Sequence, residues 1–191
     1  MAEGTLATCN EILRWDEVRV WSRTPATLDH FMQTQEPNYP QLKIRSSTNL
    51  GEVVRGADVV ATVTLARGPI AINDWISPGT HIAAIGADKA GDQELEPQIL
   101  QRARIFVDDI RQCRTDGEIN VPLTRGLIKE QEMAGEIGEI ITSRRPGRTS
   151  GEEITLFDST GIALRDSATV PLEYERAVAA GVGVEKKMIS T

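Results

Sequence analysis

Short apolar runs alternate with amphipathic stretches along this chain, and no other feature of the sequence constrains the fold as strongly. The apolar runs are residues 57–64, 81–85, 105–107 and 153–157, and two further strands are expected at the β-branched segment 17–21 and at the short segment 43–45. Strands that alternate with helices at such spacings form βαβ units, whose strands pair in parallel through right-handed crossovers. The sequence therefore predicts an α/β fold built on a doubly wound, open parallel sheet.

Boundary signals predict where the helices lie. Thr24 followed by Pro25 is a typical helix start, and residues 47–49 form a second cap. Residues 118–127 lack a regular period, so a loop is expected there. Helices are expected over residues 6–13, 25 to about 33, 50–55, 95–103, 130–142 and 161 to about 180.

Composition excludes several classes of protein. A chain of 191 residues with 40% hydrophobic and 26% charged side chains can bury the core of one globular domain. The net charge is −7 and the basic residues form no stripe, which argues against a nucleic-acid partner. No apolar run approaches the ~20 residues that span a bilayer, and the first residues lack the features of a secretion signal. A cytoplasmic protein without membrane contact is expected, and the widely separated Cys9 and Cys113 favour two reduced thiols.

Ligands of doubly wound sheets bind outside the carboxyl ends of the strands, so the residues that follow each apolar run are candidates. Ser22, Arg23 and Thr24 follow the run 17–21, where dinucleotide-binding folds meet the adenosine ribose. An acidic residue there binds the 2′-hydroxyl of NAD, whereas arginine with small hydroxyls suits the 2′-phosphate of NADP. The alternative is that Thr24 only caps the helix and Arg23 is solvated. The two interpretations are compatible, because a helix N-terminus also attracts phosphate.

Asp88 is the side chain best suited to take part in a reaction. It lies in a glycine-flanked loop after the run 81–85, where its carboxylate could exchange a proton with a substrate amine or imine. The alternative is an aspartate that stabilises a tight turn through its own backbone. Thr64 and Leu65 follow the run 57–64 and Gly86 follows 81–85, so they belong to the same predicted edge.

The remaining candidates are weaker. Ser159, Thr160 and Gly161 lie between the last strand and the last helix, where they could touch a nicotinamide or cap that helix. Asp108 and Asp109 are adjacent and would point to opposite sides of an extended backbone, which favours helix capping over metal binding. His30 and His81 have no partners at ligand spacing, so structural roles are favoured. No metal site is predicted.

Several segments together carry a resemblance to one family. In chain order they are EVRVWSRT (17–24), ADVVATVT (57–64), PGTHIAAIGAD (78–88), QEL (93–95), VDD (107–109), GEINV (117–121), GEIGE (135–139) and ITLFDSTG (154–161). In this order they cover nearly the whole chain and resemble the ornithine cyclodeaminase/μ-crystallin family, which includes archaeal-type L-alanine dehydrogenases and ketimine reductases. Segments 117–121 and 157–161 are more similar to the alanine dehydrogenase branch than to a cyclodeaminase.

The resemblance implies a Rossmann-like sheet and an NAD(P)-dependent oxidoreductase that transfers hydride at the α-carbon of an amino acid or imine. Asp88 would be the acid/base beside the substrate nitrogen. The cofactor would contact Thr64, Leu65, the Gly86 region and residues 159–161. Members with Ser-Arg-Thr after the strand 17–21 resemble NADP users, so NADP(H) is the favoured cofactor. A small amino acid or imine substrate and a family-like homodimer are the partners implied.

The sequence also departs from the family. Aligned on residues 17–21, Met1 falls just after the family's Gly-x-Gly turn, so the first sheet strand has no counterpart here. The family's substrate domain, which carries a catalytic lysine and an arginine that binds the substrate carboxylate, has no counterpart here either. Residues 1–165 are therefore expected to form an incomplete nucleotide-binding domain. Residues 166–191 are expected to form a helix and tail that pack on the substrate and dimerisation domain.

Alternatives to an oxidoreductase follow from the same comparison. They are a cyclodeaminase-type ammonia lyase, a structural or binding role, and a non-catalytic nucleotide-binding fragment. The first strand of a doubly wound sheet is central, so its loss leaves buried backbone groups unpaired at ~1–3 kcal/mol each. Low stability, aggregation or an altered mode of association is therefore predicted for the chain as written.

Overall fold

The structure is a computed structural model that describes residues 1–184 and 186. The chain divides into two compact units, Met1–Thr160 and Gly161–Thr191. The expected domain boundary at residue 165 stays a prediction. Residues 185 and 187–191 of the expected C-terminal tail lie outside the described residues.

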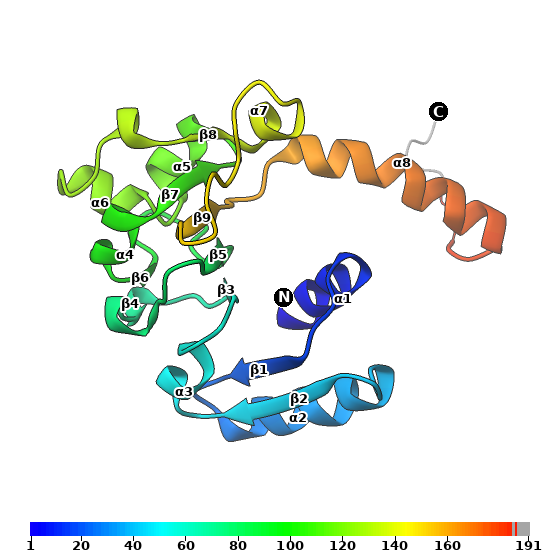
Figure 1. Ribbon diagram of the computed structural model, residues 1–191. Helices are drawn as coiled ribbons and strands as arrows, with labels where there is room; N and C mark the ends of the chain where they lie inside the picture. The colour runs from blue at the N-terminus through cyan, green and yellow to red at the C-terminus, as the bar shows by residue number, and fades with distance from the viewer. Residues whose placement is uncertain (185, 187–191) are drawn as a thin grey trace. The chain divides into compact units, whose positions relative to one another are not determined.

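A five-stranded parallel sheet forms the centre of the first unit (Figure 1). Its order is β3-β5-β9-β7-β8, and the strands span Val59–Thr62, His81–Ala84, Thr155–Asp158, Arg104–Val107 and Gly135–Glu136. Every strand pair in it is parallel. This confirms the predicted α/β class with a parallel sheet.

The main core lies around this sheet. Ile82 of β5 and Leu156 of β9 are fully buried, together with Ile99 of helix α4 (Pro97–Arg102). Strands of a parallel sheet are buried on both faces, which is why these segments are nearly continuous apolar runs in the sequence.

A separate pair of strands carries the N-terminal part of the unit. β1 (Glu17–Trp21) pairs in parallel with β2 (Lys43–Ser47). The helices that belong to it are α1 (Ala2–Ile12) and α2 (Pro25–Gln35), which bury Leu6 and Phe31 against Ile44 of β2 in a small second core. The strand 17–21 and the start of α2 at Pro25 agree with the prediction, while α1 begins earlier than expected.

The loop predictions were partly wrong. A third parallel pair, β4 (Arg67–Ala71) with β6 (Gln93–Leu95), was not foreseen. β4 contains Gly68 and Pro69, which disfavour a strand, and β6 has only three residues, the last of which overlaps the helix expected over 95–103. Residues 118–127 contain the short helix α6 (Asn120–Thr124) instead of a loop alone. Helix α5 (Ile110–Asp116) precedes it, and α3 (Leu50–Val54) follows the predicted cap at 47–49.

The single helix predicted over 130–142 was wrong. The segment contains a 3₁₀ turn at Glu130–Glu132, then β8, then α7 (Ile137–Ile141). Gly135 has a φ of 146°, in the region that favours glycine, and this backbone cannot continue a helix.

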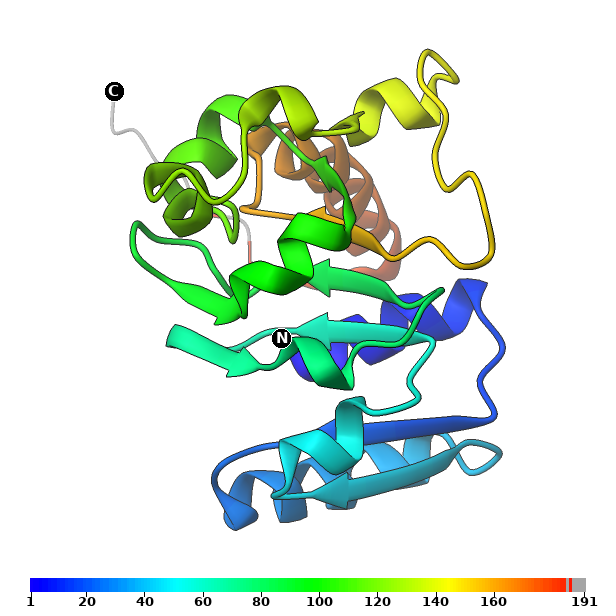
Figure 2. The ribbon, with the colours of Figure 1, turned by 60° about the vertical axis from the view of Figure 1, so that its left-hand side comes forward.

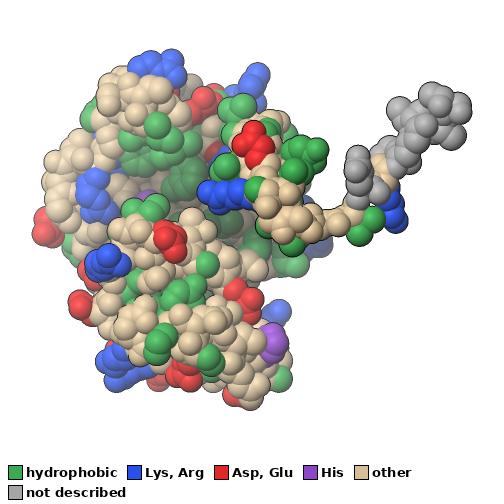
Figure 3. Space-filling model, turned by 90° about the vertical axis from the view of Figure 1, so that its right-hand side faces the viewer, with side chains coloured by type: hydrophobic (Ala, Val, Ile, Leu, Met, Phe, Trp, Pro, Cys, Tyr) green, Lys and Arg blue, Asp and Glu red, His purple; other side chains and the backbone are tan. Residues whose placement is uncertain are grey.

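The second unit contains one long helix, α8 (Ala163–Ala180), which ends at Gly181 with a φ of 64°. Five of its large apolar side chains are exposed, namely Leu164, Val170, Leu172, Tyr174 and Val178. Hydrophobic and charged side chains both show on this helix, which faces the viewer in Figure 3. Among the described residues, no helix is long and apolar enough to cross a membrane.

Candidate functional site

The carboxyl ends of three neighbouring strands meet at one edge of the five-stranded sheet. The Ile85 N–H donates to the Thr62 carbonyl at 2.9 Å, and the Ser159 N–H donates to the Ala84 carbonyl at 2.9 Å. The turns after β3, β5 and β9 therefore lie side by side, and we call this region the carboxyl edge. It brings together Thr64, Gly86, Ser159 and Thr160, which the sequence placed at strand ends without showing that they are neighbours.

Gly86 packs directly against the turn at Thr64. A Cβ on Gly86 would lie 2.5 Å from the Thr64 nitrogen and 2.5 Å from Oε2 of Glu94. The other carboxylate oxygen of Glu94 accepts a hydrogen bond from the Thr64 N–H at 2.7 Å. Glu94 is fully buried, so this hydrogen bond holds the turn at Thr64, against which Gly86 packs.

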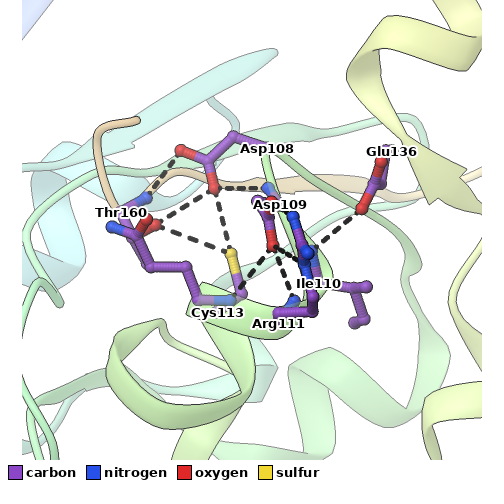
Figure 4. Close-up of polar contacts among 8 residues, drawn as sticks. Asp108, Asp109, Ile110, Arg111, Cys113, Glu136 and Thr160 are labelled. Atoms are coloured by element: carbon purple, nitrogen blue, oxygen red, sulfur yellow. Dashed lines mark hydrogen bonds and ion pairs between the residues drawn. The ribbon is translucent and has the colours of Figure 1, made fainter. Parts of the chain in front are cut away.

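Asp108 fixes the third turn in a similar way. It follows β7, and its carboxylate accepts from the Thr160 N–H at 2.9 Å and from the Thr160 hydroxyl at 3.1 Å (Figure 4). The Ser159 hydroxyl and the Cys113 thiol donate to the same carboxylate at 3.3 and 3.1 Å. The neighbouring Asp109 caps α5 by accepting from the N–H groups of Arg111 and Gln112. The predicted capping role therefore holds for Asp109, whereas Asp108 holds the turn after β9.

A succession of buried carboxylates connects these turns. Asp158, the last residue of β9, accepts from the Glu118 and Ile119 N–H groups at 3.0 and 3.1 Å. The Glu118 carboxylate accepts in turn from the Glu94 and Leu95 N–H groups at 2.9 and 2.8 Å. Glu94 then holds Thr64, so three acidic side chains lead from the turn after β9 to the turn after β3.

Burial changes the acid–base behaviour of this network. Burial raises the pKa of Asp158 to about 7, against the opposing effect of its two backbone donors. Burial also raises the pKa of Glu118 well above its ordinary value. For Cys113, burial and the nearby Asp158 carboxylate raise the pKa of the thiol, so the reactive thiolate is disfavoured. Both cysteines are free thiols.

Asp88 lies in the loop from β5 to β6, and it is exposed. In the described part of the chain its carboxylate has no hydrogen-bond or ion-pair partner, so the alternative of an aspartate bonded to its own turn gains no support. The loop itself is anchored at Gly91 and Asp92. The Gly91 N–H donates to Asn120, and the buried Asp92 pairs with Arg67 at 3.7 Å. Asp88 is thus an accessible carboxylate on a fixed loop beside the carboxyl edge.

Three other predicted residues belong to a different strand pair. Ser22, Arg23 and Thr24 follow β1, which is not hydrogen-bonded to the five-stranded sheet. The Ser22 hydroxyl accepts from the Thr24 N–H at 3.2 Å, whereas the Thr24 side chain makes no cap hydrogen bond. Thr24 therefore occupies the N-cap position of α2 without capping it through its hydroxyl, and the exposed Arg23 remains accessible.

Two further predicted site residues, Leu65 and Gly161, lie in surroundings unlike those of the buried turns. Leu65 follows Thr64 at the carboxyl edge and is 68% exposed. Gly161 belongs to the second unit, and its φ is 80°.

The histidines take structural positions. His81 lies at the start of β5, at the opposite end of the strand from the candidate site, and its Nδ1 is 2.8 Å from the Thr155 hydroxyl. Burial, together with Arg148, lowers the pKa of His81. His30 is exposed on α2.

The sequence did not reveal Glu94, Glu118 and Asp158 as parts of the site. A signal was present, because each is an acidic residue inside a short, otherwise weakly charged segment: QEL, GEI and FDS. Such side chains are seldom buried without partners, so their position in apolar segments indicates a structured polar network.

A parallel α/β sheet whose small residues and polar turns gather at the carboxyl edge has the architecture of nucleotide-binding domains. Within that class, the model of the ornithine cyclodeaminase/mu-crystallin family matches residues 1–181, and the chain belongs to this family. The resemblance described from the sequence is thereby confirmed.

Individual relatives place the chain more closely. It is 44% identical over 144 residues to the alanine dehydrogenase of Archaeoglobus fulgidus, covering 75% of this chain and 45% of the relative. Among solved structures, an archaeal alanine dehydrogenase dimer with bound NAD superposes with a TM-score of 0.91 at 36% identity, over 98% of this chain and 57% of the other. Δ1-Pyrroline-2-carboxylate reductase of Thermococcus litoralis, in complex with NADH and L-proline, gives 0.91 at 27% identity, over 97% and 57%. The chain spans about half the length of these relatives.

Proposed function

We propose that this chain forms most of the nucleotide-binding domain of an NAD(P)(H)-dependent oxidoreductase that acts at the α-carbon of a small amino acid or imine. The observation that carries the proposal is the carboxyl edge. There buried carboxylates hold the turns at Thr64 and Ser159, and Gly86 packs against Thr64, next to the accessible carboxylate of Asp88. The relatives named above are a dehydrogenase and a reductase, and their structures contain NAD or NADH.

The residues at the carboxyl edge suit a flat, polar cofactor. Gly86 and Ala87 are small and buried, so no large side chain of the turn after β5 would clash with a ligand. Leu65 offers an exposed apolar surface to a ring, and in the same turn the Thr64 hydroxyl accepts from the Ala66 N–H at 3.3 Å. Thr160 belongs to the turn that Asp108 holds through the Thr160 N–H, so its backbone is placed before a ligand arrives.

Asp88 would handle the proton of the reaction. A bound nicotinamide accepts or supplies the hydride. When an amino acid is oxidised, the Cα–H bond breaks with its electron pair, a C=N bond forms, and one proton leaves the nitrogen. The Asp88 carboxylate is the acceptor for that proton, and it returns the proton when an imine is reduced. No other acidic side chain of the anchored 85–92 loop is exposed.

The preference for NADP(H) is a separate part of the proposal. Arg23 is exposed after β1, between two small hydroxyl residues, which suits the 2′-phosphate of NADP. The two solved relatives hold NAD or NADH. Titration calorimetry with NADH and NADPH on the wild-type chain and on Arg23→Ala separates these cases. A selective loss of NADPH affinity in the variant supports the preference, and equal losses for both cofactors remove it.

The reaction is tested separately from cofactor binding. L-Alanine with NAD⁺ and a cyclic imine with NADH are assayed by the change in nicotinamide absorbance, and L-ornithine is assayed for ammonia release. Asp88→Asn is expected to retain cofactor affinity and to lose at least about 100-fold in turnover. Asp74→Asn, at an exposed aspartate before β5, is the matched control.

Each outcome has a distinct meaning. Failure of the chain to bind either cofactor contradicts the proposed binding site. Ammonia release from ornithine without net cofactor reduction would assign the chain to the cyclodeaminase alternative. Cofactor binding without turnover of any substrate would support a nucleotide-binding fragment that is not catalytic by itself.

A further inference from the structure

The loop that carries Asp88 is fixed at both ends and exposed between them. At one end the buried Gly86 packs against the turn at Thr64. At the other end the buried residues 92–95 lead into and form β6. Residues 88–91, between these two ends, are all exposed, and we call them the loop tip. The position of Asp88 therefore depends on what holds the loop tip.

One side chain holds the loop tip through a hydrogen bond. The Gly91 N–H donates to Oδ1 of Asn120 at 3.3 Å, and no other side chain in the described part of the protein bonds to the backbone of the tip. The tip also closes on itself, because the Asp92 N–H donates to the Lys89 carbonyl at 3.0 Å. In Figure 2 the arrows of β3 and β5 point toward the side of the molecule on which this loop and α6 lie. Asn120, the first residue of α6, therefore connects the tip to a neighbouring helix.

The orientation of the Asn120 amide follows from its two partners. Its Nδ2 donates to the Arg114 carbonyl of α5 at 2.7 Å, which leaves Oδ1 to accept from the Gly91 N–H. A side-chain amide has one acceptor group and one donor group, so a rotated amide would place Nδ2 against an N–H and Oδ1 against a carbonyl. Both contacts form only in the observed orientation. Asn120 thus bridges α5 and the loop tip in one defined way.

The turn that leads to Asn120 is fixed to the end of β9. Asp158 accepts from two N–H groups of this turn, at 3.0 and 3.1 Å. A Cβ on Gly117 would lie 2.4 Å from Oδ2 of Asp158, so a larger residue there would displace this buried carboxylate. The Asn120 N–H donates to the Gly117 carbonyl at 3.0 Å, which closes the turn. Residues 117–120 therefore connect the turn after β9, where the cofactor is proposed to bind, to the loop tip.

The proposed reaction requires a fixed position for Asp88. When an amino acid is oxidised, the hydride leaves Cα and the proton leaves the adjacent nitrogen. The nicotinamide and the carboxylate must therefore reach two neighbouring atoms of one substrate at the same time. A misplacement of about 1 Å can lower the rate by about 100-fold. A contact that fixes the loop tip relative to the turn after β9 consequently affects turnover without touching the substrate.

We infer that Asn120 is a positioning residue for Asp88. It holds the loop tip through the Gly91 N–H and fixes it, through residues 117–120, relative to the turn after β9. The effect of Asn120 on turnover rests on the proposed function. The order that Asn120 imposes on the loop tip depends on neither nucleotide nor substrate, so it can be measured separately.

Backbone order parameters from NMR relaxation test the contact directly. In the wild-type chain the loop tip is expected to have values of about 0.8, and in Asn120→Ala these values are expected to fall below about 0.6. Asn120→Asp keeps an oxygen acceptor for the Gly91 N–H and removes only the donor to α5, so its loop tip should stay near the wild-type values. The matched control is Asn38→Ala, which removes a similar bond from Nδ2 to the Thr34 carbonyl, 2.8 Å long, near the end of α2. This control should leave the loop tip unchanged.

Turnover provides the second test, with the substrates named for the proposed function. Asn120→Ala is expected to lower kcat by about 10- to 100-fold, while cofactor affinity changes by less than about twofold. In the Asp88→Asn background the same substitution should cost less than about threefold, because no carboxylate remains to be positioned. A purely structural role would instead weaken cofactor binding, and its cost would add to that of Asp88→Asn.

Four results would overturn the inference. One is a wild-type loop tip with order parameters already below about 0.6, a result that needs no substitution and stands even if Asn120→Ala fails to fold. Another is an unchanged loop tip in Asn120→Ala. The third is an equal loss of order in Asn120→Ala and Asn120→Asp, and the last is an additive loss of turnover with Asp88→Asn.

The two tests also separate this inference from the proposed function. The order parameters are measured without cofactor or substrate. A chain that turns over no substrate therefore contradicts the proposed activity of the chain, and the order of the loop tip still decides whether Asn120 positions Asp88.

Discussion

Replacing Asp158 with asparagine should remove a pH dependence that is built into the fold. Asp158 is fully buried, and burial raises its pKa from the ordinary value of 3.8 to about 7. Between these values the folded protein holds the proton that the unfolded chain has released. Stability therefore falls as the pH rises through this range, and it levels off above about pH 7.

The size of the effect follows from the two pKa values. A tenfold difference in proton affinity corresponds to about 1.4 kcal/mol, so the change from 3.8 to about 7 amounts to about 4 kcal/mol. This is a large share of the ~5–15 kcal/mol that stabilises a domain. Asparagine keeps the shape of the side chain and one acceptor for the Glu118 or Ile119 N–H, but it does not titrate.

Urea denaturation from pH 4 to pH 8 measures the difference in unfolding free energy between wild type and Asp158→Asn. That difference should change by about 4 kcal/mol in favour of the variant as the pH rises. Glu118 titrates in both proteins, so its contribution largely cancels. A difference that stays constant within about 1 kcal/mol over the whole range would refute the reasoning.

Glu153→Gln provides a control of opposite sign. The Thr149 N–H lowers the pKa of Glu153, so its contribution is present above the ordinary value of 4.5 and is lost as the pH falls below it. Both variants should therefore resemble wild type at low pH and depart from it as the pH rises, Asp158→Asn towards higher stability and Glu153→Gln towards lower stability.

Three further predictions concern single side chains. Gly86→Ala should lower the melting temperature and weaken cofactor binding in calorimetry, because the added Cβ would lie 2.5 Å from the Thr64 nitrogen; an unchanged protein would mean that the two turns are not in close contact. In the folded chain a disulfide reagent should modify the half-buried Cys9 well before the buried Cys113, whose thiol pKa is raised, and equal rates would contradict that burial. Asp109→Ala should cost about 1 kcal/mol in urea denaturation by removing the cap of α5, whereas Asp109→Asn should cost less; equal costs would show that the cap does not act through its side-chain oxygen.

The strands and helices that alternate regularly along the chain could be predicted from the sequence. The segments at 17–21 and 81–85 are strands within one residue of their expected ends, because both are rich in β-branched or other apolar residues that favour a strand. The sequence does not reveal β4 because Gly68 and Pro69 interrupt it, and it does not reveal β6 because that strand has only three residues. The sequence does not show that the helix expected over 130–142 is interrupted at Gly135. A residue with positive φ is marked in the sequence only by a glycine, and a glycine alone does not prove such a backbone.

The sequence by itself determined the parallel α/β class, the family and the set of strand-end residues from which the candidate site is built. Only the tertiary structure decided which of those residues are neighbours. It brings Thr64, Gly86 and Ser159 together and leaves Ser22 to Thr24 on a separate strand pair. It also showed Glu94 as the buried support of that edge. The physical reason is that apolar periodicity is local along the chain, whereas strand order and the burial of a charged group depend on contacts between segments far apart in sequence.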